Sequence, residues 1–378
     1  MRLFCAAAAA LLLAGCGGDP RPADDTASNP VEDHFRTLVI RDSIGIEMGD
    51  SNYVLGAIEG VDHDAHGNIL VLDRSAACVR VYDGSGEFMA QVGRRGSAPG
   101  ELENPISFTL LGDGRICIID PWRGGILTYN PDYSFQGLKV NITNNTPALM
   151  TGLNDSGFVA GQVGYRNEGG TITAFVRMLR YDLQPEPSRI YQENEFVIDF
   201  MDLGRTLEQT LFWGAFTGDR NGNVYFALME PDQYLIEGVR EDGTRFMTAT
   251  HEMEEVPKTQ QEKIDEEAWV LATLRGWNAQ WGVEDYEPQP MRNQVRQLNV
   301  DGQGRIWALR GTREDPTFDV FHGETGDFLF TAELPGIGYE GLFWNFTIDE
   351  GGITAYSEMP LDYPRIYILE LQEDGGEE

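Results

Sequence analysis

Arginine and tryptophan side chains lie in polar segments next to short apolar runs of this sequence. They are Arg74, Arg94, Arg95, Trp122, Arg123 and Arg310. A guanidinium is a planar donor that pairs with carboxylate or phosphate through parallel hydrogen bonds, and an aromatic ring beside it offers an apolar face. These residue types favour a site for an anionic or carbohydrate-like ligand, or for an acidic segment of a protein partner. Alternatively, each arginine pairs with a neighbouring Asp or Glu, as surface arginines commonly do.

Groups suited to catalysis are scarce. Of the five histidines, only His251 could reach the arginine-bearing segments; the others stand beside turns or near the N-terminus, at His34, His63, His66 and His322. A zinc site built from three histidines is therefore not expected. The sequence also has no Ser-His-Asp order, phosphate-binding loop or Cys–His pair. We assign no catalytic residue, and a binding module is a better interpretation than an enzyme.

A repeated pattern of short strands and tight turns must position these residues. Between Val61 and Pro105, apolar runs alternate with turns rich in Asp, Asn and Gly, which is typical of antiparallel hairpins. The glycine that closes the first turn recurs at positions 67, 114, 157, 222, 304 and 352, each time followed by an apolar strand. Such four-stranded units cannot bury both faces alone. Six of them predict an all-β fold, a six-bladed β-propeller.

The propeller fold decides where the arginines and the two insertions lie. Connections between blades share one end of the central channel with the loops between second and third strands, so we expect both there. One insertion covers residues 193–210. The other, at about 253–289 between blades four and five, contains a helix that begins with the capping box of Thr259 and Glu262. We expect one face of this helix to carry Ile264, Ala268, Leu271 and Arg275, with Trp277 and Trp281 next along the chain.

The two ends of the propeller complement each other. Residues 35–48 contain a strand-like run before the first complete unit, and the last unit lacks one strand before the chain ends in an acidic tail. We expect the N-terminal strand to become the outer strand of the last blade, which closes the ring and removes an open edge.

The segment from Gly67 to Pro105 resembles an NHL repeat, a family with a Gly-Asn turn, an apolar strand ending in Asp and a strand closing in Tyr-Asp. The family's glycine-rich connector is matched by Gly93, Gly96, Pro99 and Gly100, whereas Cys78 stands where the family usually has Arg. The whole chain resembles bacterial six-bladed propeller lipoproteins of the NHL/TolB-like type. The resemblance implies the fold and hardly any specific activity.

Lactonase-like propellers of similar fold hold a divalent cation near the starts of the innermost strands with Glu, Asn and Asp. The residues at those positions here are Glu59, Asn104, Asn293 and Asn345. Oxygen ligands of this kind would suit Ca²⁺, the one cofactor we consider. The alternative function is therefore a metal-dependent hydrolase, lactonase or lyase at the channel mouth. Asn and Glu are also ordinary cap and turn residues at strand starts, and then no cofactor is needed.

Residues 1–16 form a targeting segment. An apolar run from Leu3 to Ala14 is too short to span a bilayer and has the length of a signal-peptide core. Leu13-Ala14-Gly15-Cys16 resembles the bacterial lipobox, which implies acylation of Cys16 and stable anchoring; the alternative is an ordinary secretory signal. We expect a signal peptide over 1–15, a flexible tether over 16–34, the propeller over 35–372 and an acidic tail over 373–378. The protein would then lie in the cell envelope at the outer membrane, facing the periplasm or the cell surface.

Composition restricts the partners. The net charge of −33 argues against nucleic acid and against membrane contact other than through the anchor. Cys78 and Cys117 remain after processing, and they either form a disulfide or stay separate buried thiols.

Overall fold

The computed structural model describes residues 35–141, 147–184, 186–198, 214–276 and 286–372. The predicted signal peptide, tether and acidic tail, with Cys16, lie outside the described residues. In the described part no helix is long and apolar enough to cross a membrane.

Four sheets each contain four antiparallel strands that are consecutive in the chain. The first contains β2 (Ile58–His63), β3 (Ile69–Asp73), β4 (Cys78–Tyr82) and β5 (Phe88–Val92). The second contains β6 (Ser107–Leu110), β7 (Ile116–Asp120), β8 (Gly125–Tyr129) and β9 (Phe135–Asn141). The third contains β10 (Pro147–Gly152), β11 (Phe158–Glu168), β12 (Thr171–Tyr181) and β13 (Arg189–Val197). The fourth contains β14 (Gly214–Gly218), β15 (Val224–Leu228), β16 (Leu235–Val239) and β17 (Arg245–Thr250).

The fifth sheet has eight strands in the order β18-β19-β20-β21-β1-β24-β23-β22. Its strands are β1 (Phe35–Ile44), β18 (Val295–Val300), β19 (Arg305–Arg310), β20 (Thr317–His322), β21 (Phe328–Glu333), β22 (Trp344–Ile348), β23 (Ile353–Ser357) and β24 (Ile366–Gln372). The helices of the described part are α2 (Gln260–Gly276) and the short 3-10 helices η1 (Pro121–Arg123) and η2 (Gly338–Phe343).

The N-terminal strand β1 joins the two halves of the fifth sheet. It pairs antiparallel with β24, from Thr37 opposite Gln372 to Ile44 opposite Ile366. Its first three residues pair in parallel with β21. Neither β21 nor β24 therefore presents an open edge along these registers, and Leu38 between them is fully buried.

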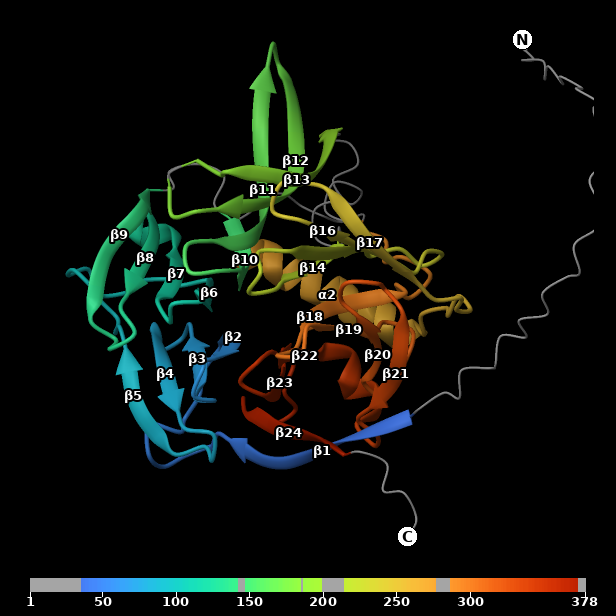
Figure 1. The fold of residues 1–378 in the computed structure, drawn as a ribbon. Helices are drawn as coiled ribbons and strands as arrows, with labels where there is room; N and C mark the ends of the chain where they lie inside the picture. Colours follow the sequence, from blue (N-terminus) through green and yellow to red (C-terminus); the bar gives the residue numbers. More distant parts are fainter. Residues whose placement is uncertain (1–34, 142–146, 185, 199–213, 277–285, 373–378) are drawn as a thin grey trace, which may run out of the picture. The chain divides into compact units, whose positions relative to one another are not determined.

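The sheets follow one another around a ring, as the ribbon shows (Figure 1). The first strand of each unit packs beside the first strand of the next, from β2 through β6, β10, β14 and β18 to β22, and β23 packs beside β2. Apolar clusters fill the space between neighbouring sheets, with Trp307, Phe158 and Tyr225 among the largest fully buried side chains. The prediction of an all-β propeller is thus confirmed as to fold class.

The repeated Asp–Gly turns have a common local cause. In the first, the Asp64 carboxylate accepts hydrogen bonds from the backbone N–H groups of His66 and Asn68, at 2.9 Å each. Gly67 takes a φ of +77°, which a residue with a Cβ rarely adopts. Asp219 binds the N–H groups of its own turn in the same way. The residues of each turn therefore determine its conformation. In each unit this turn joins the first strand to the second.

The third sheet differs from the others in length. β11 and β12 form a hairpin of eleven residues on each side that projects from the ring (Figure 1). The ladder continues into β13, which includes residues 193–197. The first part of the predicted insertion at 193–210 is therefore strand, and the rest, from residue 199, lies outside the described residues.

Helix α2 begins as predicted and packs differently. Thr259 Oγ1 accepts from the N–H of Glu262, and Glu262 Oε2 accepts from the N–H of Thr259, which is the predicted capping box. On the face named from the sequence, Ile264 is 48% exposed and Ala268 is exposed, whereas Val270, outside that face, is fully buried. Polar contacts hold the helix, among them Glu262 with Arg292 and Glu266 with Tyr286. The periodicity of apolar residues does not predict such contacts. Trp277 and Trp281 lie outside the described residues.

Candidate functional site

The ring of sheets has two ends with different chemistry, and we call one the mouth end and the other the turn end. At the mouth end the first strands begin and the second strands finish, and at the turn end lie the Asp–Gly turns. Six residues at the mouth end form what we call the mouth cluster: Glu59, Arg74, Asn104, Arg296, Asn345 and Glu358.

Arg74 connects the first two sheets at the mouth. It follows β3 and donates from Nη1 to Glu59 Oε1 on β2 at 3.1 Å. It also donates from Nε to Asn104 Oδ1, just ahead of β6, at 2.9 Å. One predicted arginine and two predicted metal ligands are therefore brought together.

Asn345 and Glu358 belong to the same cluster. Asn345, on β22, donates from Nδ2 to Glu358 Oε1 at 2.6 Å. Burial raises the pKa of Glu59, the hydrogen bond and charge of Arg74 lower it, and the negative charge of Glu358 raises it again. The carboxylates of Glu59 and Glu358, from opposite ends of the sequence, thus repel each other at the mouth.

Arg296, on β18, completes the cluster. Its guanidinium donates to the carbonyls of Gly341 and Leu342, at 2.9 Å for the former, while its Nε is buried without a partner among the described residues. Burial lowers the pKa of Arg296 to about 10, and the charge of Glu358 acts in the opposite direction. Nearby in sequence, the Oδ1 of Asn293 is also buried without a partner among the described residues.

Two of the four predicted calcium ligands face an arginine in this structure. Ca²⁺ takes six to eight oxygen ligands. Here the oxygens of Glu59 and Asn104 face the guanidinium of Arg74 instead. In the part of the chain that the structure describes, no group of three or more His, Cys, Asp or Glu side chains could hold a metal ion. We derive no metal-dependent step.

The remaining predicted arginines bind local partners. Arg94 lies 2.8 Å from the Glu101 carboxylate, and Arg123 lies 3.3 Å from that of Glu103. Arg95 donates to the carbonyls of Ser75 and Glu103, at 2.8 and 3.1 Å.

Arg94, Arg95 and Arg123 thus gather around the connector at 98–103, beside Arg74. Trp122, in η1 of the same region, is 71% exposed. Arg310 stands apart on β19, where it binds the buried carboxylate of Asp319 at 2.9 Å. These contacts match the alternative in which the arginines pair locally.

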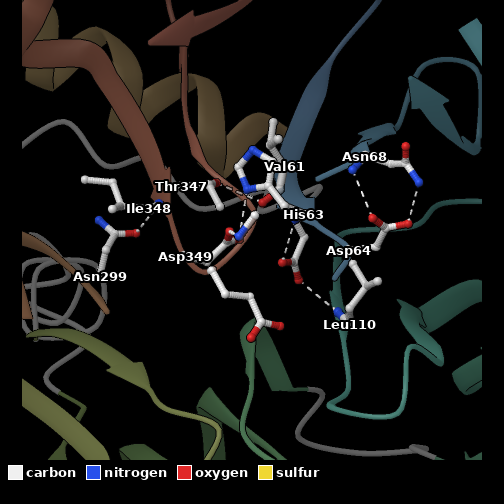
Figure 2. A network of polar contacts seen from close by, with 12 residues as sticks. Val61, His63, Asp64, Asn68, Leu110, Asn299, Thr347, Ile348 and Asp349 are labelled. Carbon is white, nitrogen blue, oxygen red and sulfur yellow. Dashed lines mark hydrogen bonds and ion pairs between the residues drawn. The ribbon is translucent and has the colours of Figure 1, made fainter. Parts of the chain in front are cut away.

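The turn end holds a polar network that the sequence did not indicate (Figure 2). Asp62, on β2, accepts from the N–H of Leu110 at 2.8 Å and from Thr109 Oγ1 at 3.0 Å. His63 Nδ1 lies 2.9 Å from Asp349 Oδ2, which comes from the turn after β22. These contacts join the first sheet to the second and to the last.

Arg220 reaches across the same end of the channel. From the turn after β14 it donates to the carbonyl of Leu110 at 3.2 Å, and its Nε lies 3.4 Å from Glu350. The side chain therefore links three sheets.

The charged groups of this network shift one another's pKa values. Burial and the charge of Asp349 raise the pKa of Asp62 to about 6. Burial alone would lower the pKa of His63, but Asp349 and the neighbouring Asp62 and Asp64 raise it. Because His63 and Asp349 are 286 positions apart, no local signal pairs them.

The two cysteines of the propeller are free thiols. Cys78 and Cys117 are both buried, and burial raises their pKa values to about 11 and about 12. Thiols of this kind are protonated at neutral pH and act as small apolar side chains.

Comparison with known proteins indicates the fold class. A family model described as a 6-bladed beta-propeller matches residues 47–150. No curated protein sequence matches the chain at a significant level.

Solved structures resemble most of the chain at low identity. A protein described as exported, from Bacteroides fragilis, is 14% identical with a TM-score of 0.47, covering 89% of this chain and 95% of its own. Virginiamycin B lyase from Staphylococcus aureus is 10% identical with a TM-score of 0.46, covering 89% and 100%. Regucalcin, a calcium-binding protein from Agrobacterium tumefaciens, is 10% identical with a TM-score of 0.42, covering 89% and 95%. At such identities the likeness says nothing of activity.

Proposed function

We propose that this chain is a lipid-anchored, six-bladed propeller of the cell envelope that binds a partner at the mouth of its channel. In this proposal β22, β23, β24 and β1 form the sixth blade, with β1 as its outer strand. The NHL/TolB-like resemblance of residues 67–105 and the lipobox ending at Cys16 support an extracytoplasmic lipoprotein.

One observation carries the binding function: charged and amide side chains from the first, second and fifth sheets converge at the mouth. Arg74 joins Glu59 to Asn104, Asn345 binds Glu358, and both Arg74 and Glu358 are exposed. Polar groups that a rigid scaffold gathers on its loops and strand ends are a common place for recognition.

The chemistry of the mouth favours a polypeptide segment. The cluster carries both signs of charge, with Glu59 bound to Arg74 and Glu358 acting on Arg296. A simple anion would meet the two carboxylates, and a simple cation would meet the two guanidiniums. A peptide group offers a carbonyl to Arg74 and an N–H to Glu358, which are exposed, and it adds no net charge. A loop or terminus of a partner protein therefore fits these groups.

Photo-crosslinking in the membrane-anchored protein tests this function. A photoreactive residue is placed at Met359 or Trp122, which are exposed beside the mouth, and as a control at Ser85, which is in the turn after β4 at the turn end. We expect the same protein adduct from both mouth positions and none from Ser85. Arg74→Gln should reduce the adduct. Equal adducts from both ends, or none from the mouth, would refute mouth binding.

The anchor is tested separately. Cys16→Ala should release the protein from membranes or leave an uncleaved precursor, without changing the melting of the propeller. A mature chain that starts at another residue and stays in the membrane fraction would contradict the lipobox interpretation.

A further inference from the structure

Three of the innermost strands carry a β-bulge at the same place. The register of each strand shifts there by one residue, which leaves Glu59 on β2, Leu149 on β10 and Arg296 on β18 as the extra residue. Each lies eight positions before the turn glycine of its own unit (59 and 67, 149 and 157, 296 and 304). The first strands of the units in between, β6, β14 and β22, pair in continuous register. The bulges therefore occur in every second unit around the ring, at equivalent positions.

This equivalence places Leu149 at the mouth, because the other two bulge residues belong to the mouth cluster. A hydrogen bond agrees with it: the N–H of Met150, the next residue, donates to Ser107 Oγ at 3.0 Å. Ser107 comes three positions after Asn104 of the same cluster. A bulge turns a side chain in a new direction, and bulges are frequent next to binding sites. Leu149 thus adds an apolar side chain to a mouth whose cluster is polar.

The backbone and the surroundings of Leu149 are both unfavourable for a leucine. Its φ is +53°, in the left-handed region where a residue with a Cβ is strained. Its side chain is 68% exposed, whereas Met150 is 9% exposed and packs in the apolar cluster between the second and third sheets. Leu149 therefore costs backbone energy without a matching gain in the core. Strain of this kind is found mainly where a side chain serves a function.

We propose that Leu149 is the apolar contact residue of the mouth, and that the partner segment presents an apolar side chain to it. This inference rests on the function proposed above, and it narrows the class of partner. Hydrogen bonds from a peptide group to Arg74 and Glu358 can be made by any sequence. Contact with Leu149 in addition requires an aliphatic, Met or Phe side chain, because burying two apolar surfaces together removes both from water.

The strain at Leu149 can be measured without a partner. Leu149→Gly and Leu149→Ala both remove the exposed side chain, but only glycine adopts a positive φ without strain. Within a strand glycine ordinarily gives a less stable protein than alanine. At this position the order should reverse, and the glycine variant of the full-length protein in detergent should melt about 1–2 °C above the alanine variant. An alanine variant that melts at the same temperature or higher would overturn the inference, because Leu149 would then not be strained.

Photo-crosslinking from Met359 in the membrane-anchored protein tests the contact itself. Both variants of Leu149 should lower the yield of the protein adduct by about five- to tenfold, as expected for the loss of one apolar side chain from an interface. Met89→Ala is the matched control, since Met89 is an apolar residue 53% exposed on the outer strand β5, and it should leave the yield unchanged.

The outcomes separate this inference from the function on which it rests. A yield that falls with Arg74→Gln but not with either variant of Leu149 would refute the apolar contact and leave binding at the mouth intact. An equal loss with Met89→Ala would also count against the contact, because the effect would not be specific to the mouth. The absence of any adduct from the unsubstituted mouth would refute both proposals.

Discussion

The turn end and the mouth end of the channel use similar residue types for different purposes. At the turn end, Asp62, His63 and Asp349 are largely buried and bind one another or the backbone of the next sheet. At the mouth end, by contrast, Arg74 and Glu358 are exposed. Contacts of the first kind close the ring, whereas groups of the second kind remain available for recognition.

Sequence distance explains part of this difference. The turn end must join the first sheet to the last, and it does so through His63 with Asp349 and through Thr347 Oγ1, which donates to the carbonyl of Val61 at 2.9 Å. Contacts of this kind stabilise the closed ring because they join its first sheet to its last. The mouth carries the blade connections, which vary in length without disturbing the strands.

The largest effect should come from removing β1, on which closure of the fifth sheet depends. Deleting residues 35–44 exposes the edges of β21 and β24, so we expect aggregation and loss of a single cooperative melting transition. Calorimetry and size-exclusion chromatography measure this.

Two point variants on β1 serve as a matched pair. Leu38→Ala should cost about 2–5 kcal/mol because Leu38 is fully buried. Ile40→Ala should cost less because Ile40 is partly exposed. A truncated protein that melts like the intact one would show that β1 is not needed for the ring.

The second prediction compares the ends directly. Asp349→Ala leaves His63 buried without its hydrogen-bond partner, and we expect a loss of about 1–3 kcal/mol in the free energy of unfolding. Glu350→Ala, one residue along and exposed, should change it by less than about 1 kcal/mol. Denaturant unfolding measures both. Similar losses for the two variants would argue against a special role of the buried pair.

The pH dependence of stability should identify the turn end as well. Because the pKa of Asp62 is raised to about 6, the folded state keeps a proton that the unfolded chain, with an ordinary Asp pKa of about 3.9, has lost. Stability should therefore fall as pH rises from about 4 to about 6, by on the order of 2 kcal/mol from this group.

Asp62→Asn is the matched variant for this dependence. The asparagine keeps an oxygen for Leu110 and Thr109 but cannot titrate, so the fall between about pH 4 and about pH 6 should be smaller than in the wild type. Parallel curves for the two proteins would refute the raised pKa.

The smallest effect on stability should come from the mouth. Arg74 is 43% exposed in its side chain, so Arg74→Gln should cost at most about 1 kcal/mol. The same variant frees the oxygens of Glu59 and Asn104, and crosslinking at Met359 measures whether partner binding changes. A loss of several kcal/mol would mean that the mouth, like the turn end, is chiefly structural.

Local features of the structure could be predicted from the sequence alone. The Asp–Gly turns depend on contacts within a few residues, as Asp64 with His66 and Asn68 shows, and the capping box of Thr259 and Glu262 spans one helical turn. Counting apolar strands between such turns was enough to predict an all-β propeller. Three arginines, Arg94, Arg95 and Arg123, lie around the connector at 98–103, and the turn pattern of the sequence already placed them in neighbouring loops.

Only the tertiary structure decided which residues meet. His63 with Asp349 and Asp62 with Leu110 are pairs whose partners belong to different sheets, and Arg296 became part of the mouth cluster without any local signal. The contacts of α2 are of the same kind, because Glu262 in its first turn pairs with Arg292, 30 positions along the chain. A short motif determines its own backbone, whereas the position of one sheet beside another depends on how the ring packs and closes as a whole.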